Sequence, residues 1–384
     1  MGYRRRVRGT TSERAELPAA AGALRRSLLN WFERNRRDLP WRNRRDPFAV
    51  WVSEIMLQQT TAATAARYYG PFLERFPDVA ALAAAPEDEV LAAWSGLGYY
   101  RRARRLRLAA RRIVASGGRF PSTSREWLRL PGVGRYAASA IASIAFGEPV
   151  AAVDGNVRRV LARLLALEGD PARGSGARRI EDAASRLVAG ARPGDVNEAL
   201  MDLGATTCRP RRPDCARCPW RRWCRALADG SPERFPPPRT RPDEIRVARA
   251  AALLRGRGCV LLRRGPRGSL NEGMWDLPGA ELWRSGPGAS RGGEPESWSP
   301  RMARRFRLAL RRETGLAIRP GRLLGTFRHV ITRHRIRLFV VEARLEAEPA
   351  GDGWAWFSPP RLAGAALTSA ARRALRATGV LTER

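Results

Sequence analysis

The sequence contains no lysine, so all 71 of its basic residues are arginines. This absence excludes any mechanism that needs a lysine amine as a nucleophile. Acidic residues are also scarce, 37 in number, and the formal net charge is +34. A bias towards GC-rich codons explains arginine in place of lysine, but it does not explain the excess of base over acid. The charge therefore favours a polyanionic partner, and nucleic acid is the simplest one.

Long apolar runs are missing too. No stretch of about 18 apolar residues occurs, so no transmembrane helix and no membrane partner are expected. The basic start of the chain lacks the apolar segment of a secretory signal, and Arg6 breaks the myristoylation pattern. We expect a soluble intracellular protein, cytoplasmic and nucleoid-associated as in bacteria.

Cysteine is rare, but four of the five cysteines fall within 17 residues. In a reducing cytosol such a cluster indicates metal or iron–sulfur ligation rather than disulfides. The spacing C-x6-C-x2-C-x5-C holds a single C-x2-C pair, whereas zinc ribbons usually have two. The cysteine cluster has two interpretations, a 4Fe-4S cluster site and a zinc knuckle. The four ligands would be Cys208, Cys215, Cys218 and Cys224.

The 384 residues allow two to three domains, and a hydrophobic fraction of 44% is enough for a sizeable core. A basic tail covers 1–19, and helical periodicity runs through 20–228. A Pro-rich linker follows at 229–244. Residues 245–384 mix short β-type runs with a basic helix, and their Gly/Pro/Ser-rich stretch 284–300 is typical of a mobile loop.

Local signals place several helices in the first part. Asp46 followed by Pro47 is a strong helix start, and residues 101–115 form an amphipathic helix with a basic face. Thr123 and Glu126 form a capping box. Gly147 is a stop signal for a later helix.

A glycine-rich turn, "LPGVG" at 130–134, joins two of the expected helices. Gly132 and Gly134 would let the backbone come close to a phosphate, and free N–H groups at a helix start would bind it. Such a contact positions DNA without reading its sequence. An ordinary turn between two helices is the alternative.

Asp154 precedes a helical repeat that begins at Val157, so we expect it to cap a helix. The helix dipole and backbone N–H donors would hold its carboxylate ionised. Beside the anomeric carbon of a nucleotide, such a carboxylate would stabilise an oxocarbenium-like transition state. A purely structural cap is the competing interpretation.

Several long motifs, taken together, carry a family resemblance. "VWVSEIMLQQT", "GLGYY", "LPGVGRYAASAI", "AAVDGNVRRVLARL", "NEALMDLGATTC" and the four-cysteine loop resemble the adenine DNA glycosylase (MutY-type) family. This family belongs to the helix-hairpin-helix/endonuclease III superfamily, and the match covers roughly residues 24–226. It implies an all-α helix-hairpin-helix glycosylase domain with a 4Fe-4S cluster loop at 208–224. The family removes adenine that is mispaired with 8-oxoguanine or with guanine, and it does so by flipping the adenine out of double-stranded DNA.

The resemblance also implies catalytic roles. Glu54 would protonate the adenine, and its apolar neighbours favour a raised pKa, although a surface glutamate flanked by core residues is the alternative. Asp154 would stabilise the oxocarbenium ion, and Asn156 would orient the water or the carboxylate. Tyr136 stands where bifunctional relatives have a lysine and would hydrogen-bond near Asp154. A monofunctional enzyme that stops at the abasic site is therefore expected.

Further positions match family residues that bind DNA or the base. Gln59 and Tyr99 match residues that wedge into the duplex, and Thr60 lies beside the first of them. The residues that match positions around the adenine pocket are Trp41, Arg42, Leu57 and Glu198.

The second part, with "GMWDLPGAEL" and "LRRETGLAI", resembles a Nudix domain, an α+β fold. Arg312 replaces a glutamate that magnesium binding needs, which argues for a reading module and against a triphosphate hydrolase. In the family this domain recognises 8-oxoguanine. Its recognition loop departs from the family pattern: His329 is present, but Ile331 and Thr332 follow, and the strength of lesion discrimination stays open.

Other functions stay open at this point. One is another helix-hairpin-helix glycosylase, acting on a different mismatch or on an oxidised base. Another is a non-catalytic DNA-binding protein with a zinc knuckle, and the paired Asp154 and Glu54 argue against it. A Nudix hydrolase is the last. We expect a monomer, whereas the redox role of the cluster and any partner proteins are not given by the sequence.

Overall fold

The computed structural model describes residues 21–42, 44–237, 243–286, 289 and 293–381. The basic tail and the middle of the predicted linker lie outside the described residues. Within the described part of the chain, no helix is long and apolar enough to cross a membrane.

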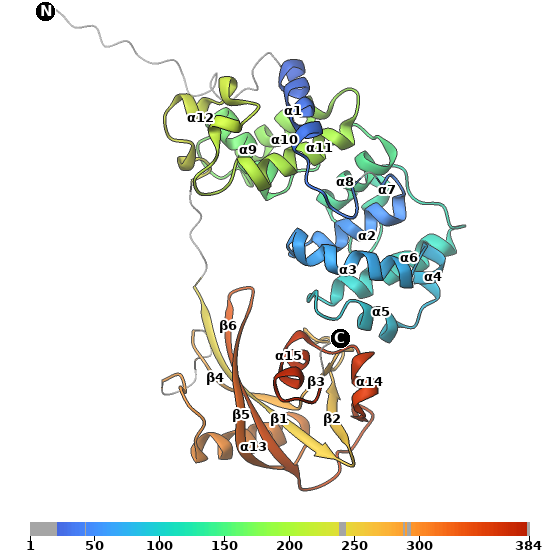
Figure 1. Ribbon diagram of the computed structural model, residues 1–384, viewed down its shortest axis with the longest axis vertical. Helices are drawn as coiled ribbons and strands as arrows, with labels where there is room; N and C mark the ends of the chain where they lie inside the picture. The colour runs from blue at the N-terminus through green and yellow to red at the C-terminus, as the bar shows by residue number, and fades with distance from the viewer. Residues whose placement is uncertain (1–20, 43, 238–242, 287–288, 290–292, 382–384) are drawn as a thin grey trace, which may run out of the picture. The chain divides into compact units, whose positions relative to one another are not determined.

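The chain divides into two compact units. The first comprises Met1–Leu73, Asp78–Ala80 and Leu108–Thr240, and the second comprises Glu74–Pro77, Ala81–Arg107 and Arg241–Arg384. Each unit is described separately below, and the helices and strands carry the labels of Figure 1.

The chain before the linker is helical. Its α-helices are α1 (Ala21–Asn35), α2 (Pro47–Leu57), α3 (Ala62–Arg75), α4 (Val79–Ala84), α5 (Glu87–Ala93), α6 (Arg101–Ala115), α7 (Ser124–Trp127), α8 (Arg135–Phe146), α9 (Gly155–Leu165), α10 (Gly174–Val188), α11 (Pro193–Asp202) and α12 (Arg225–Ala228). The short helical turns are the π-helical η2 (Leu203–Thr207) and the 3-10 turns η3 (Cys215–Arg217), η4 (Arg221–Trp223) and η5 (Pro232–Arg234).

The predicted helix boundaries are confirmed where a side chain or a glycine sets them. Asp46 caps α2 by accepting a hydrogen bond from the N–H of Ala49 at 2.8 Å. Thr123 and Glu126 form the capping box of α7. Gly147 ends α8 with φ of 74°, a left-handed conformation that glycine adopts without steric cost. Local chemistry therefore fixes where these helices start and stop.

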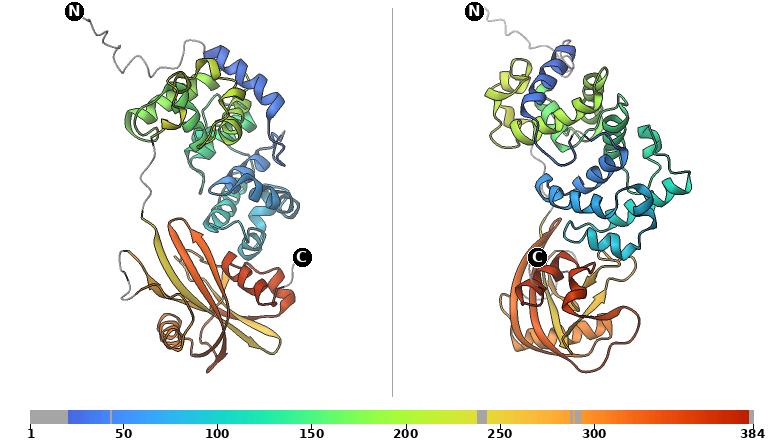
Figure 2. Two further views of the ribbon diagram at one scale, coloured as in Figure 1. Left: turned by 60° about the vertical axis from the view of Figure 1, so that its left-hand side comes forward. Right: turned by 45° about the vertical axis from the view of Figure 1, so that its right-hand side comes forward.

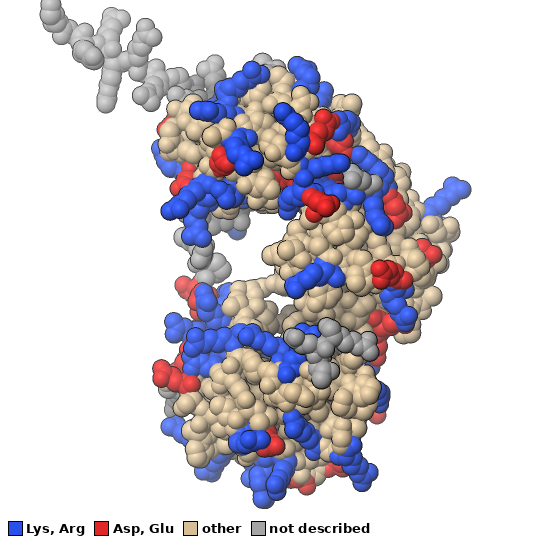
Figure 3. Space-filling view, in the orientation of Figure 1, with Lys and Arg blue, Asp and Glu red and all other residues tan. Residues whose placement is uncertain are grey.

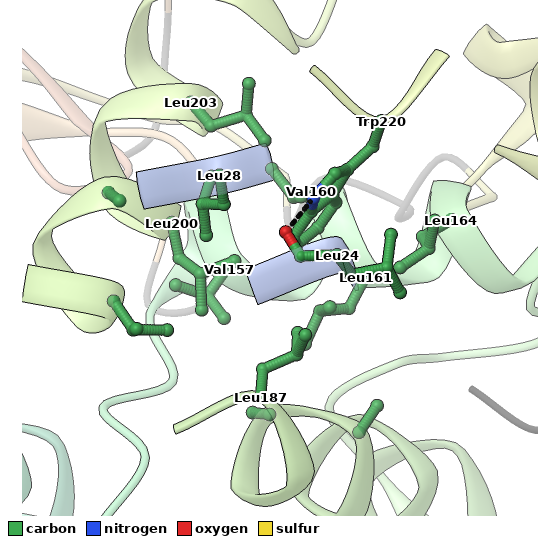
Figure 4. Close-up of a cluster of buried hydrophobic side chains, with 14 of the residues drawn as sticks. Leu24, Leu28, Val157, Val160, Leu161, Leu164, Leu187, Leu200, Leu203 and Trp220 are labelled. Atoms are coloured by element: carbon green, nitrogen blue, oxygen red, sulfur yellow. Dashed lines mark hydrogen bonds between the residues drawn. The ribbon is translucent and has the colours of Figure 1, made fainter. Parts of the chain in front are cut away.

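The core of the first unit surrounds α1. Leu24 and Leu28 are completely buried and pack with Leu161 of α9 and with apolar side chains of α10 and α11 (Figure 4). Trp220, from the cysteine loop, enters the same core and donates its indole N–H to the carbonyl oxygen of Leu24 at 2.9 Å. The loop is thereby anchored to α1 by burial and by a satisfied hydrogen bond.

Helix α2 is buried on all sides over most of its length, from Phe48 to Met56. Trp51 contacts Trp127 of α7, with ring centroids 5.6 Å apart. A helix that is apolar all round is one that runs through a core. Glu54, in the middle of α2, is therefore held within the protein interior.

The second unit contains a seven-stranded mixed sheet. Its strands are β1 (Ile245–Gly256), β2 (Cys259–Arg264), β3 (Trp275–Asp276), β4 (Gly279–Arg284), β5 (Ile318–Ile331), β6 (His334–Leu345) and β7 (Trp354–Phe357). The order is β3-β2-β1-β6-β5, with β4 paired to β1 and β7 paired to β2. Strands β1 and β6 run parallel, and the other pairs are antiparallel.

Helices cover both faces of this sheet (Figure 2). Phe306 and Leu310 of α13 (Pro300–Thr314) pack on one face. Leu362 of α14 (Pro359–Ala363) and Leu375 of α15 (Ser369–Ala377) pack on the other. A mixed sheet between helices confirms the predicted α+β class for this part of the chain.

The stretch 284–300 was expected to be a mobile loop. Residues 287–288 and 290–292 lie outside the described residues, but the end of the stretch is packed. Trp298 lies 6.1 Å from the ring of Phe306, and Glu294 forms an ion pair with Arg337 at 3.1 Å. The tryptophan explains this order, because burying an indole offsets the entropy lost on fixing the backbone.

Candidate active site

Asp154 caps α9, as predicted. One carboxylate oxygen accepts the N–H of Val157 at 2.7 Å, and the other accepts the side-chain amide of Asn156 at 3.0 Å. The side chain remains partly exposed. The capping interpretation and the catalytic one are thus compatible, because the cap holds the carboxylate in place without covering it.

Asn156 is itself fixed from behind. Its side-chain oxygen accepts a hydrogen bond from Arg159 at 2.9 Å, and Arg159 also donates to the carbonyl oxygens of Gly204 and Cys208. A Cβ atom on Gly204 would lie 2.5 Å from the Cβ of Asn156. The π-helical turn η2 therefore rests directly on Asn156, and only glycine fits at that contact.

Asn197 of α11 holds the loop that leads to Asp154. Its fully buried side chain accepts the N–H of Ala152 at 2.9 Å and donates to the carbonyl oxygen of Val150 and the hydroxyl of Ser143. Sequence analysis did not select this residue. Its motif position, next to Glu198 in "NEALMDLGATTC", was the available signal.

Glu54 lies on α2 and is 4% exposed. Burial raises the pKa of its carboxyl to about 7, a hydrogen bond with Tyr136 opposes the rise, and the charge of Glu198 adds to it. The Oε2 atom is fully buried and has no hydrogen-bond partner within the described residues. A carboxyl in this state carries a proton near neutral pH and has an oxygen that a ligand nitrogen could satisfy.

Tyr136, on α8, joins the two acids. Its side chain is half-buried, and its hydroxyl donates to the sulfur of Met201 at 3.3 Å. Burial raises the pKa of this hydroxyl well above its usual value, and the charges of Glu54 and Asp154 add to the rise. The tyrosine therefore stays protonated and faces both carboxyls. The hydroxyl hydrogen-bonds to Met201 of α11 and to Glu54, the acid that shares the site with Asp154.

Arg42 and Glu198 form an ion pair beside Glu54. Burial raises the pKa of Glu198, and the charge and hydrogen bond of Arg42 oppose that rise. Trp41 is 7% exposed and packs edge-on against Tyr69, with ring centroids 5.6 Å apart. The structure thus brings together Glu54, Tyr136, Asp154, Arg42 and Glu198, while Trp41 is a core residue at their side.

Residues at the end of α2 are more exposed. Leu57 is the last residue of the helix, and Thr60 donates its N–H to the carbonyl oxygen of Leu57 at 3.3 Å. Gln59 is exposed and has φ of 58°, a left-handed conformation that costs a non-glycine residue about 1 kcal/mol or more. The strained backbone presents this side chain to the surface.

The glycine turn joins α7 to α8 as predicted. Gly132 has φ of 82°, which explains the requirement for glycine there. Gly134 is the N-cap of α8, without a side-chain cap and without an acidic residue in the first turn. A Cβ at Gly134 would meet open space, so this helix start is accessible.

In the second unit, Tyr99 also has a left-handed backbone, with φ of 49°. The guanidinium of Arg102 lies 5.6 Å from its ring centroid and donates to the carbonyl oxygens of Leu97 and Gly98. Burial lowers the pKa of Arg102 to about 10. One buried arginine thus supports the whole "GLGYY" turn.

Tyr99 and His329 line one cavity of about 790 Å³ in this unit, together with Arg249 and Asp276. Burial lowers the pKa of His329, and the charges of Arg249 and Arg373 lower it further. Thr332 lies apart from this lining, on the exposed turn between β5 and β6, with φ of 52°. His329 and Tyr99 therefore line the same cavity, whereas Thr332 lies at the tip of the hairpin.

The four cysteines of the loop are half-buried. Burial raises the pKa of Cys218 to about 12, and the other three cysteines raise it further when ionised. Arg163 donates to the sulfur of Cys208 at 3.4 Å. No metal-binding group of three or more ligand side chains is formed among the described residues. Four half-buried thiols that repel one another when ionised are a donor set that suits a cationic iron or zinc centre.

Replacement of Glu54 by glutamine tests whether its carboxyl is buried and protonated. A pKa raised by folding gives stability that is complete below the unfolded value near 4.5 and is lost as the pH rises through about 7. The loss amounts to about 3 kcal/mol. Glu54→Gln should therefore melt higher than the parent at pH 8.5, with a smaller difference at pH 5. Thermal unfolding at both pH values measures this, with the exposed Glu181→Gln on α10 as control. Equal differences at both pH values would contradict it.

Comparison with known proteins finds relatives of this chain. Residues 52–190 match the family model described as "HhH-GPD superfamily base excision DNA repair protein". Adenine DNA glycosylase from Rattus norvegicus is 34% identical over 410 residues, which span 92% of this chain and 77% of that protein. The human adenine DNA glycosylase is 49% identical over 218 residues, covering 54% of this chain and 40% of that protein. The structure of a thermostable thymine-DNA glycosylase superposes with a TM-score of 0.50 and 30% identity, covering 58% of this chain and all of that one.

The extent of the match to the rat protein decides the family. It runs through both parts of the chain rather than the helical part alone, and the matched segment contains Glu54, Tyr136 and Asp154. The chain therefore belongs to the adenine DNA glycosylase family.

Proposed function

We propose that this chain is a monofunctional glycosylase that excises adenine mispaired with 8-oxoguanine, and with guanine, from double-stranded DNA. One observation carries the proposal: a buried Glu54, whose pKa burial raises to about 7, and a capped, partly exposed Asp154 both face Tyr136. Two carboxyls in opposite environments can take separate acid and stabiliser roles.

The residues suggest the order of events. Glu54 donates its proton to a ring nitrogen of the flipped adenine, so that the base leaves neutral when the glycosidic bond breaks. The electron pair of that bond goes to the base, and Asp154 stabilises the positive charge left on the sugar. Water then adds to the anomeric carbon, and its proton returns to Glu54. Asn156 holds Asp154 in place through this change.

Binding of DNA is supported by charge and by backbone geometry. Arginine side chains spread over the visible face of each unit, with fewer acidic ones among them (Figure 3). The uncapped start of α8 offers N–H donors to a phosphate. Gln59 and Tyr99, both on strained turns, would enter the base stack beside the lesion.

The four-cysteine loop would hold a 4Fe-4S cluster, with Cys208, Cys215, Cys218 and Cys224 as ligands. Bound there, the cluster would fix the fold of a loop rich in arginine that meets the DNA backbone. Trp220 and Arg163 anchor this loop to the core, which supports a structural role rather than a catalytic one.

Residues 245–384, which resemble a Nudix domain by their motifs, would read 8-oxoguanine. The cavity lined by His329 and Tyr99 supports this role, and Thr332 would contact DNA from the hairpin tip. We also propose that the protein is a monomer and that it acts on chromosomal DNA at the nucleoid.

A duplex assay tests the function. A 30-mer with adenine opposite 8-oxoguanine is incubated with the protein and then treated with alkali, and cleavage of the adenine strand is expected. No cleavage is expected without alkali, because the chain has no lysine to cut the abasic site.

A duplex with thymine opposite guanine serves as control, since the thymine-DNA glycosylase shares the fold. Cleavage of the thymine strand alone would replace the proposed substrate. Strand breaks before alkali would contradict the monofunctional mechanism.

Replacement of Asp154 by asparagine tests the stabiliser role. The amide keeps the size of the side chain but cannot offset a positive charge, so base release should fall by about 10²-fold or more. Affinity for the adenine–8-oxoguanine duplex should change little. Single-turnover rates and a binding titration separate the two effects, and a rate within about threefold of the parent would remove Asp154 from the mechanism.

A further inference from the structure

Asp202 is the last residue of α11 and is completely buried. Its oxygens accept the backbone N–H of Arg37 at 3.1 Å, the Nε of Arg37 at 2.8 Å and the Nη2 of Arg42 at 2.7 Å. A second nitrogen of the Arg37 guanidinium lies 2.7 Å away. A buried carboxylate is costly unless it is paired and hydrogen-bonded, and this one is saturated by a single segment, 37–42.

That segment joins α1 to α2 and is not helical. It carries Arg42 into the site, where only 8% of the side chain is exposed. Because Asp202 binds both the backbone of Arg37 and the side chain of Arg42, it fixes the path of the segment and the direction of the guanidinium together.

Arg42 is shared between two acids of the same helix. One terminal nitrogen contacts Glu198 and the other contacts Asp202, and the guanidinium lies over the ring of Phe32 at 5.4 Å. Glu198 and Asp202 are four residues apart and so lie on one face of α11. The two carboxylates bind both terminal nitrogens of the planar Arg42 guanidinium and so hold it in one orientation.

We propose that Asp202 is a positioning residue for base excision, which holds Arg42 against Glu198 and so fixes the charge arrangement that Glu54 meets. The proposal rests on the function proposed above. It adds a residue that touches neither Glu54 nor the base and that acts through Arg42.

The direction of the effect follows from the groups that face Glu54. These are Tyr136 from α8, Glu198 from α11, Asp154 at the start of α9 and Arg42 from the segment before α2. Of these charges, only Arg42 lowers the pKa of Glu54. The carboxylate of Asp202 lies against Arg42 and offsets part of the positive potential that Arg42 exerts at Glu54. Without that carboxylate, the potential at Glu54 is more positive. The pKa of Glu54 should then fall, and less of the acid should be protonated at neutral pH.

The test compares three variants with the parent protein. Asp202→Asn removes the charge, and Asp202→Glu keeps it. Asp195→Asn is the matched control, because Asp195 lies on the same helix and also binds two arginines, Arg45 and Arg192. Carbon-13 NMR follows the titration of the Glu54 carboxyl, identified by its loss in Glu54→Gln. Single-turnover adenine release is measured at pH 5.5 and pH 8.

The Glu54 titration in Asp202→Asn should move to lower pH by about half a unit or more, which corresponds to a threefold or larger change in the acid dissociation constant. Adenine release should fall more at pH 8 than at pH 5.5. Asp195→Asn should keep the parent titration, and Asp202→Glu should return it towards the parent.

An unshifted Glu54 titration in Asp202→Asn would overturn the proposal. Rates lowered equally at both pH values, together with melting temperatures lowered as in Asp195→Asn, would also overturn it, since they indicate a structural role alone. If Asp202→Asn does not fold, Arg42→Gln decides: the charge of Arg42 lowers the pKa of Glu54, so the titration should move to higher pH, and an unshifted titration would overturn a role exerted through Arg42. The titration needs no substrate, so failure of the parent to release adenine would reject the proposed function separately.

Discussion

Burial of a carboxyl within an apolar helix is the constraint on which the rest of the site depends. Helix α2 runs through the core, and Glu54 is only 4% exposed, so little water reaches its carboxyl to stabilise a charge. Because an ionised carboxylate is unfavourable there, burial raises the pKa of Glu54 to about 7. Tyr136 and Arg42 lie next to the Glu54 carboxyl. Asp154 is partly exposed, because it caps a helix at the edge of the site.

Helix α11 and the π turn η2 act as the common support. Asn197 holds the loop before Asp154, Met201 receives the hydroxyl of Tyr136, and Gly204 seats Asn156. Glu198 and Asp202 each form an ion pair with Arg42. A π-helical turn is uncommon and is often found at functional sites, and here it brings backbone against the residue that steadies Asp154.

The features that could be predicted from the sequence are those that neighbouring residues determine. The caps at Asp46, Thr123 and Asp154, the turn at Gly132 and the burial of Glu54 all follow from neighbouring residues. The roles of Asn197, Asp202 and Gly204 could not be found in this way. Their contacts join residues 45 to 165 positions apart, which no local pattern reveals. The partner of Tyr136 was missed for the same reason, because Met201 comes from another helix.

The proposed reaction requires a protonated Glu54 for departure of the base. The most direct test is the pH dependence of single-turnover adenine release from the adenine–8-oxoguanine duplex, measured from pH 5 to pH 9. The rate should be highest at low pH and should fall tenfold per pH unit once the pH exceeds the pKa of about 7. A rate that stays constant through this range, or that rises with pH, would contradict the role of Glu54 as the acid.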